Sequence, residues 1–302
     1  MKEIVLITGA NGMIARELAG KIENEYELRF LTRKKKYANE YEWDIKKGTI
    51  EESALENVSH IIHLAGANIS EKRWTAERKK ELISSRTDSA ALLQNALSRK
   101  EIKLKSFISA SGINFYGTET TEKIYSENDL PGHDFLSEVV VLWERAADHF
   151  KEHNLAERVV KIRTAVVLSE KDGALKKMIP PIQYYIGSPL GNGKQYMPWI
   201  HIEDICSMYE FALKNVNIHG AYNAVSPQHA TNADFTKKVA EVLNKPLLMP
   251  NVPAFILKML FGELANAILE GSRASSQKIQ DAGFHFKFPD LKNALKDLLK
   301  DQ

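Results

Sequence analysis

Apolar runs of strand length alternate with helical patterns through the first half of the chain. Residues 4–7 are all apolar, and Ile14, Leu18 and Ile22 follow them at helical spacing. Such alternation is typical of a parallel sheet with helices on both faces. The same pattern predicts further strands at 28–32, 41–44, 58–66, 106–112 and 159–168, and helices at about 75–98 and 135–150.

The alternation stops after Leu168, where loops with Pro180-Pro181 and the glycines of residues 189–193 begin. We therefore expect two domains. Residues 1–168 are predicted to form a doubly wound parallel sheet of the Rossmann type, which is an α/β fold. Residues 169–302 are predicted to form a smaller, mostly helical C-terminal α/β domain that contacts the substrate.

Part of the second half is expected to return to the first sheet. Residues 221–225 have the pattern of a strand, so we assign a segment near 196–228 to the Rossmann domain in space. Thr231 and Asp234 then form a capping pair in front of an amphipathic helix. The remainder of the chain is predicted to be mostly helical.

The first strand meets its helix at a glycine turn. Gly9 allows a tight turn, and Gly12 lets the backbone approach a diphosphate closely. The small Ala15 lets the helix pack on the strand and direct its N–H groups at the phosphates. A strand followed by a glycine turn is also an ordinary structural solution, but strand, turn and helix together favour a dinucleotide site. To this site we assign Gly9, Asn11, Gly12, Met13 and Ile14.

The charge at the end of the second predicted strand indicates which coenzyme is bound. Units that prefer NAD place an acidic residue there for the ribose 2′-hydroxyl, whereas this chain has Arg33 and Lys34. An arginine suits a 2′-phosphate, so the sequence favours NADP. The alternative, a solvated basic turn, describes Lys35 and Lys36.

Two later strand ends complete the predicted coenzyme site. Asp44 ends the third strand, where its carboxylate can accept from an adenine amino group, although an ordinary turn aspartate fits equally well. The fourth strand ends in Leu64, Ala65 and Gly66, as a buried parallel strand passing under a coenzyme should. His63, just before them, is expected to pack in the strand.

Composition and charge exclude several classes of protein. The 302 residues carry 41 Lys and Arg against 39 Asp and Glu, a formal charge of +2, so we expect no nucleic-acid or membrane binding. Cys206 is the single cysteine and no leader precedes the first strand, so a reducing cytoplasm is the simplest interpretation. His149 and His153 align on one helical face, but no third ligand is near, so no metal site is predicted.

Four motifs follow the predicted strands: Thr8-Gly9-x-x-Gly12-x-x-Ala15, His63-Leu64-Ala65-Gly66, Ser109-Ala110-Ser111 and Tyr116-Gly117. Together they resemble the extended short-chain dehydrogenase/reductase family, which contains the nucleotide-sugar epimerases and dehydratases. The resemblance implies an NADP-binding Rossmann domain and a smaller C-terminal domain that closes over the cleft. Longer motifs are similar to one atypical branch, the epimerase-family proteins of the YfcH type: Lys72-Arg73-Trp74-Thr75, Ser85-Arg86, Arg163-Thr164-Ala165-Val166-Val167-Leu168 and Pro198-Trp199-Ile200-His201-Ile202-Glu203-Asp204.

The chain departs from the wider family at its catalytic pair. Family members carry Tyr-x-x-x-Lys on the helix after the serine strand, where the tyrosine is the general acid/base and the lysine lowers its pKa. None of the 10 tyrosines here has a lysine four residues later. The helix has Phe135 and Val139 at the corresponding positions, and neither side chain can transfer a proton or supply a charge. The named branch also lacks the pair.

The remaining candidates for catalysis are polar groups near the serine strand. Ser111 matches the family's catalytic serine, which hydrogen-bonds the reacting oxygen, although a hydroxyl alone is a poor acid. Tyr116, Glu138 and His201 are the alternatives for proton transfer, but Tyr116 also fits a role in fixing its loop. Trp199 and His201 are assigned to the wall of a substrate pocket, with plain core as the other interpretation.

Two further residues and two functions complete the sequence-based expectations. Arg73 is assigned to a coenzyme phosphate, with salt bridging as the alternative, and Leu168 to the coenzyme at the last strand end. The first function is an NADP-dependent reductase or epimerase-like enzyme acting on a polar small molecule, with nucleotide-linked compounds among the candidates, as a monomer or homodimer. The second is a non-catalytic NADP-binding sensor. A nucleotide-free scaffold is disfavoured because the coenzyme features agree with one another.

Overall fold

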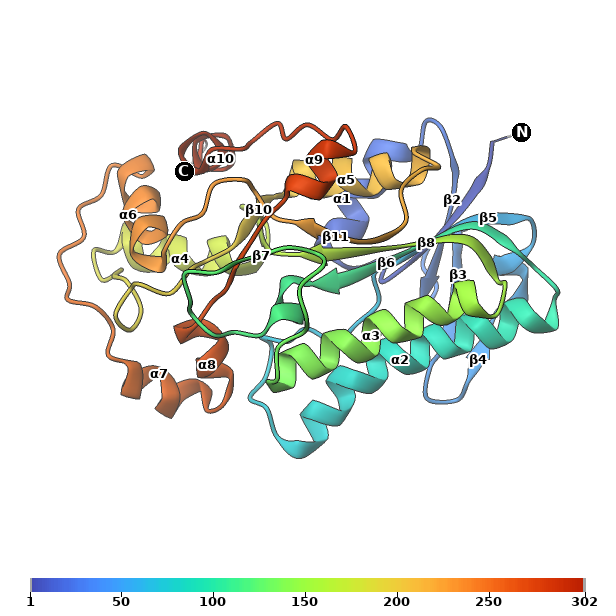
Figure 1. The fold of residues 1–302 in the computed structure, drawn as a ribbon, viewed down its shortest axis with the longest axis horizontal. Helices are drawn as coiled ribbons and strands as arrows, with labels where there is room; N and C mark the ends of the chain where they lie inside the picture. Colours follow the sequence, from blue (N-terminus) through green and yellow to red (C-terminus); the bar gives the residue numbers. More distant parts are fainter. Residues whose placement is uncertain (1, 301–302) are drawn as a thin grey trace.

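The computed structural model describes residues 2–300, and an eight-stranded sheet runs through its centre (Figure 1). The strand order is β11-β8-β6-β5-β1-β2-β3-β4, and every neighbouring pair is parallel except β3 and β4. The chain builds outward from β1 in one direction and then from β5 in the other, so the predicted doubly wound sheet is confirmed. The strands are β1 (Ile4–Thr8), β2 (Glu27–Thr32), β3 (Glu40–Asp44), β4 (Thr49–Ile50), β5 (Val58–His63), β6 (Leu104–Gly112), β8 (Ala156–Thr164) and β11 (Gly220–Ala224).

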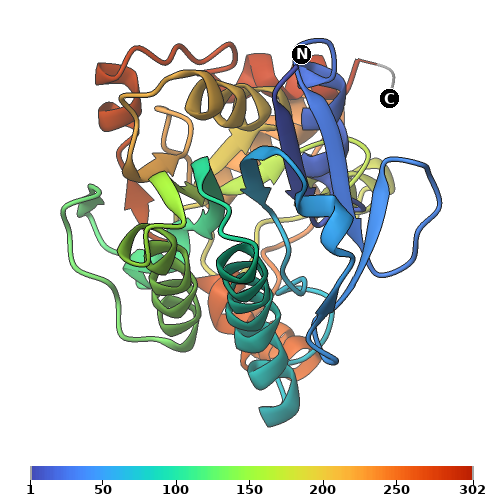
Figure 2. The same cartoon turned by 90° about the vertical axis from the view of Figure 1, so that its right-hand side faces the viewer.

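Helices cover both faces of this sheet (Figure 2). On one face α2 (Ala76–Arg99) and α3 (Phe135–Glu152) run side by side, and on the other lie α1 (Met13–Ile22) and α5 (Ile202–Lys214). The apolar residues of α3 extend well past one stripe because this helix packs against α2 as well as the sheet. Among residues 2–300, each helix lacks the length or the apolar character that a membrane crossing requires.

The predicted strand 159–168 is in fact two strands. β8 ends at Thr164, and β9 (Val166–Leu168) leaves the main sheet to pair with β10 (Trp199–His201). The change occurs at Ala165, whose N–H bonds to β11, whereas the next N–H bonds to Pro198 O. An apolar run cannot reveal such a change of partner strand, because both halves are rich in apolar residues.

The C-terminal part lies at one end of the sheet (Figure 1). The expected loop at Pro180-Pro181 is wrong, because both prolines lie in the last turns of α4 (Gly173–Gln183). Burial of Leu175, Ile179 and Ile182 in a third core cluster favours the helix despite the missing N–H groups. The predicted capping pair is confirmed: Thr231 and Asp234 form a capping box.

Short elements complete the structure. The pair β7–β12 joins a loop after β6 to the C-terminal part. The remaining bounds are η1 (Glu52–Leu55), η2 (Ile113–Tyr116), β7 (Ile124–Tyr125), α6 (Asn232–Val242), α7 (Ala254–Phe261), α8 (Leu264–Leu269), β12 (Arg273–Ala274), α9 (Gln277–Asp281) and α10 (Leu291–Leu298), where η marks a 3-10 helix.

Candidate functional site

The glycine turn at the end of β1 leaves no room for a side chain. Gly9 has φ +71°, and a Cβ there would lie 2.9 Å from the carbonyl carbon of Leu64. Gly12 N donates to Gly9 O at 2.8 Å, and α1 then begins without a side-chain cap. Uncapped N–H groups at a helix start favour anions through hydrogen bonds and the helix dipole. The turn therefore suits a phosphate.

A chain of hydrogen bonds fixes the floor beside the turn. Thr8 Oγ1 accepts from the backbone N–H groups of the two residues after His63, both at 3.0 Å. Its own hydrogen therefore goes to His63 Nδ1 at 3.0 Å. Ser89 Oγ donates to Arg86 O and so accepts from His63 Nε2 at 3.1 Å. Burial lowers the pKa of His63 to about 4, and this neutral imidazole packs within the strand as expected.

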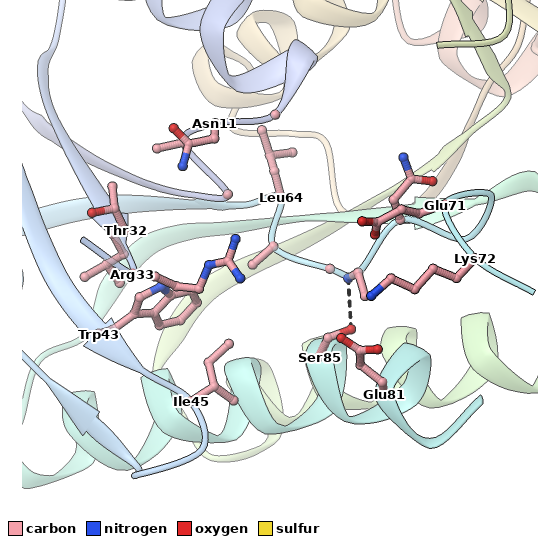
Figure 3. A pocket seen from close by; sticks show the side chains of 18 of the residues that line it. Asn11, Thr32, Arg33, Trp43, Ile45, Leu64, Glu71, Lys72, Glu81 and Ser85 are labelled. Carbon is pink, nitrogen blue, oxygen red and sulfur yellow. Dashed lines mark hydrogen bonds between the residues drawn. The ribbon is translucent and has the colours of Figure 1, made fainter. Parts of the chain in front are cut away.

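A cleft of about 460 Å³ opens at the carboxyl ends of β1 and β5, where the strand order reverses (Figure 3). It starts at the glycine turn, passes the ends of β2 and β3, and reaches the segment between β5 and α2. Ligands of doubly wound sheets bind at this switch point. The lining residues are Gly9, Ala10, Asn11, Gly12, Leu31, Thr32, Arg33, Trp43, Ile45, Leu64, Ala65, Gly66, Ala67, Asn68, Glu71, Lys72, Arg78, Glu81 and Ser85.

Two polar groups at the end of β2 line the cleft without partners. Thr32 is 4% exposed, and its hydroxyl forms no hydrogen bond within residues 2–300. The neighbouring Arg33 has no hydrogen bond and no ion pair in the same part of the chain (Figure 3). Buried polar groups are normally paired, so an unpaired one beside a cleft points to a ligand.

The wall after β3 is apolar. Trp43 and Ile45 line the cleft, and they flank Asp44 on both sides along the chain. The Asp44 carboxylate accepts instead from the N–H groups of Lys46 and Lys47 at 3.0 and 3.1 Å. The turn interpretation of Asp44 therefore describes what its side chain does, while its neighbours provide a surface for a ring.

The serine end of the sheet has a different character. Ser111 Oγ donates to Glu144 Oε1 at 2.6 Å, and Arg163 holds both oxygens of that carboxylate at 2.7 and 2.9 Å. Arg163 also donates to the Tyr116 hydroxyl at 2.8 Å, which in turn donates to Asn223 at 2.8 Å. None of these residues is more than 5% exposed. The five residues form a closed, fully hydrogen-bonded network, called the serine network below.

The helix next to this network carries no acid where the family has one. Phe135, at the start of α3, packs edge-on against Trp74 with ring centroids 5.3 Å apart, and Lys79 lies 4.8 Å above its ring. Val139 is buried. Burial raises the pKa of Tyr116 to about 12, so its hydroxyl keeps its proton near neutral pH. Neither Tyr116 nor Ser111, whose hydroxyl already donates to Glu144, is a ready proton donor.

Comparison with known proteins identifies the family. A sequence profile described as the NAD dependent epimerase/dehydratase family matches residues 5–224. The chain belongs to this family. Residues 252–298 match a second profile, which is described as a domain of unknown function, DUF1731.

Relatives in the epimerase family are similar over nearly their whole length. Epimerase family protein ML0860 of Mycobacterium leprae is 32% identical over 297 residues, 97% of this chain and 95% of the relative. Epimerase family protein YfhF of Bacillus subtilis is 32% identical over 304 residues, 99% and 98% of the two chains.

Solved structures of the family agree with the fold. Human epimerase family protein SDR39U1, crystallised with NADPH, superposes with a TM-score of 0.89 at 30% identity and covers 99% of this chain and 100% of that chain. A nucleoside-diphosphate sugar epimerase from Corynebacterium glutamicum gives a TM-score of 0.80 at 26% identity, over 99% of this chain and 58% of the other. The resemblance seen in the sequence is thus confirmed.

The structure brings together part of the predicted coenzyme set of this epimerase-family protein. The predicted residues that line the cleft are Gly9, Asn11, Gly12, Arg33, Leu64, Ala65 and Gly66. Those that lie outside its lining are Met13, Ile14, Lys34, Asp44, Arg73 and Leu168. Sequence reasoning missed Thr32, Trp43 and Lys72. The alternation of side chains along a strand could have identified Trp43. Trp43 and Ile45 flank Asp44 and therefore lie on the face opposite to its side chain.

The residues predicted for a substrate pocket lie away from the cleft. Trp199 is fully buried, and its indole N–H donates to Gln228 O at 3.1 Å. His201 caps α5, since its Nδ1 accepts from Glu203 N at 3.1 Å, and its ring stacks on Phe288. Burial lowers the pKa of His201 to about 4. Their surroundings are those of a core.

The histidine pair on α3 has no further metal ligands. His149 and His153 stack with ring centroids 5.5 Å apart. Across residues 2–300, no group of three or more His, Cys, Asp or Glu side chains is arranged to hold a metal ion. The pair lies at the last turn of the helix, where His149 also faces Glu152 at 3.7 Å.

Proposed function

We propose that this epimerase-family protein is an NADP(H)-dependent oxidoreductase or epimerase-like enzyme that acts on a polar substrate. The observation that carries the proposal is the pair of unpartnered groups at the end of β2, Thr32 and Arg33, in the same cleft as the glycine turn. A guanidinium free of carboxylates suits a 2′-phosphate, whereas a NAD site would place an acid there. The NADPH in the structure of human SDR39U1 supports the same choice.

The residues of the cleft fit the parts of this coenzyme. The uncapped start of α1 suits the diphosphate, Arg33 the 2′-phosphate, and the apolar pair Trp43 and Ile45 the adenine ring. When bound, the coenzyme supplies or accepts a hydride. The chain itself binds and orients it over the floor that Thr8 and His63 hold in place.

The names of family members suggest which substrate class to test first. Nucleotide-linked compounds are the first class to test, because the Corynebacterium glutamicum neighbour is named a nucleoside-diphosphate sugar epimerase. As a monomer or homodimer in the cytoplasm, the protein would take a small molecule from solution.

A second candidate is a non-catalytic NADP-binding sensor. The serine network favours it, because the Ser111 hydroxyl already donates to Glu144 and is not available to a substrate oxygen. Phe135 and Val139 occupy the positions of the missing acid and lysine. Under this function the coenzyme would change a surface that another protein recognises.

Replacing Arg33 with alanine tests the coenzyme assignment. We expect Arg33→Ala to weaken NADPH binding roughly 10- to 100-fold, because a charge-assisted hydrogen bond contributes about 1.5–3 kcal/mol, and to change NADH binding far less. Calorimetric titration of both coenzymes measures this. Lys36→Ala removes a neighbouring exposed charge outside the cleft and is the matched control. Equal losses for NADPH and NADH would remove the argument for a 2′-phosphate.

Isotope transfer separates the enzyme from the sensor. The protein is incubated with deuterated NADPH and a panel of sugar nucleotides, ketones and aldehydes, and deuterium in the products is measured by mass spectrometry. Transfer to any member supports the enzyme. Tight NADPH binding without transfer to any of them supports the sensor.

A further inference from the structure

Residues 66–75, which lie in the segment between β5 and α2, are called the strap below. Two neighbouring cations of the strap point in different directions. Lys72 lines the cleft and faces Arg33 across it (Figure 3). Arg73 instead reaches the C-terminal helices, where its Nη2 donates to Met259 O of α7 at 3.3 Å. The Arg73 guanidinium also packs against Gly262, where a Cβ would lie 3.2 Å from Nη2. The sequence favoured Arg73 for a phosphate, but Lys72 is the one in the cleft.

The donors of Lys72 are unused because Arg78 forms the close ion pairs with the nearby carboxylates, although the charge of Lys72 also acts on Glu81. Arg78, itself buried, pairs with Glu81 at 2.6 Å and with Glu71 at 3.2 Å. Within residues 2–300, the Lys72 ammonium forms no hydrogen bond and no ion pair within 4.0 Å. Arg78 and Lys72 together balance the two carboxylates, so Arg33 leaves the cleft with a net positive charge. Lys72 and Arg33 both keep unused hydrogen-bond donors, so an anion placed between the walls can accept from both.

The strap is anchored at several points, so the backbone that carries Lys72 is held in place before any ligand arrives. Ala67 N donates to Ser85 Oγ at 3.0 Å, and the Trp74 indole N–H donates to a strap carbonyl at 3.0 Å. Lys79, at the start of α2, pairs with Glu263 in front of α8 at 2.6 Å. A preorganised group loses less entropy when it binds, so more of its interaction energy appears as affinity.

We infer that Lys72 binds a phosphoryl group of the coenzyme from the wall opposite Arg33. Arg73 is a positioning residue that holds the strap on α7, within the C-terminal segment that matches DUF1731. The assignment rests on the proposed coenzyme function. It also gives that C-terminal segment a task, because its helices brace one wall of the cleft.

The test compares Lys72→Met with Lys80→Met by calorimetric titration of NADPH and NADH over a range of salt concentrations. Lys80 is an exposed lysine near the start of α2, the helix that follows the strap. It lies outside the cleft and has no ion pair among residues 2–300. We expect Lys72→Met to weaken NADPH about 10-fold and to flatten the salt dependence of binding, since a screened contact is lost. Lys80→Met should stay within about twofold of the parent.

The two coenzymes identify which phosphate is bound. Equal losses for NADPH and NADH assign Lys72 to the shared diphosphate, and a loss for NADPH alone assigns it to the 2′-phosphate. NADPH and NADH affinities both within about twofold of the parent, or equal losses in the Lys72 and Lys80 variants, would overturn the inference while the proposed function stands. A parent protein that binds neither coenzyme would instead remove the proposed function itself.

A double-mutant cycle tests the positioning role of Arg73. We expect Arg73→Ala to weaken NADPH about threefold and to shrink the effect of Lys72→Met, because a loosened strap no longer holds the ammonium in place. A purely structural role would give additive losses. Strict additivity would therefore overturn the positioning role and leave the Lys72 contact intact.

Discussion

Two regions at the carboxyl edge of the main sheet, one at the end of β2 and one at the end of β6, differ in how their polar groups are paired. At the β2 end, Thr32, Arg33 and Lys72 line an open cleft, and their side chains form no hydrogen bond or ion pair within residues 2–300. At the serine end, Ser111 and Glu144 belong to a buried network in which each member bonds to another. Both ends lie at the carboxyl edge of the same sheet, so fold alone does not explain the difference.

The comparison indicates that the hydrogen bonding of polar side chains distinguishes a ligand-binding region from a structural one. The buried, unpaired hydroxyl of Thr32 costs free energy in the absence of a ligand, and a ligand in the cleft would offset that cost. Arg33 and Lys72 are exposed, so their charges stay solvated until an anion binds. A saturated network instead ties several elements together, here β6, α3, β8 and β11 through Ser111, Glu144, Arg163 and Asn223. The first end is therefore expected to control coenzyme affinity, and the second to control stability.

The largest expected effect is on the serine network. Glu144→Ala leaves the buried Arg163 guanidinium without its counter-charge, which should lower the free energy of unfolding by about 3–5 kcal/mol. Denaturant titration measures this loss. NADPH affinity of the folded variant should stay within about threefold of the parent, because the network does not line the cleft.

Glu138→Ala is the matched control for that experiment. Glu138 is an exposed glutamate on the same helix, and its loss should cost no more than about 1 kcal/mol. A Glu144 variant with near-parent stability and strongly weakened coenzyme binding would break the comparison, since the network would then belong to the working site.

A smaller effect is expected for His63, which lies beneath the cleft and, like the serine network, is fully hydrogen-bonded. The folded-state pKa of His63 is about 4, below the ordinary value of about 6.5. Above pH 6.5 both states are neutral, but between pH 6.5 and 4 the unfolded chain takes a proton that the folded chain refuses. Stability should therefore fall with falling pH, by up to about 1.4 kcal/mol per unit for this histidine.

Unfolding titrations at pH 7 and pH 5 check this dependence in two variants. His63→Gln should reduce the loss between the two pH values, whereas His219→Gln changes an exposed histidine and should leave it as in the parent. His201, whose pKa is also lowered to about 4, should keep part of the loss in both variants. A loss that is the same in all three proteins would show that His63 is not the group responsible.

The smallest expected effect is that of removing the Thr32 hydroxyl, which tests the comparison at a single group. Thr32→Val removes an unpaired buried group, so stability without coenzyme should be unchanged or rise by up to about 1 kcal/mol, while NADPH affinity falls about fivefold. Thr236 has an equally buried and unpaired hydroxyl on α6, outside the cleft. Thr236→Val should therefore match the stability change and leave affinity alone. Fluorescence titration and thermal unfolding of both variants decide the matter.

The sequence was informative where the chemistry is local. The glycine turn, the strands around β1 and the sign of charge at Arg33 depend on neighbouring residues, so the fold and the start of the cleft could be predicted. The turn of Thr231 was predictable for the same reason, since a capping box needs only four consecutive residues.

Side-chain direction was beyond sequence reasoning. Lys72 and Arg73 are adjacent and equally charged, yet which of them enters the cleft depends on Met259, far along the chain. Ser111 meets a carboxylate on a helix and a guanidinium on another strand, and no spacing rule links these three positions. Such pairings are set by packing between distant elements, and pattern analysis of one chain does not contain them.

The placement of α5 and β11 limits how this molecule can be divided. β11 is the outermost strand beside β8, and α5 buries Ile205, Met208 and Tyr209 against the sheet, yet both follow the insertion that carries α4. A fragment that stops at residue 168 would expose a bare strand edge and an apolar face. A minimal recombinant coenzyme-binding domain therefore needs residues 199–224 in addition to residues 1–168. A circular permutant that retains both segments is the better starting point.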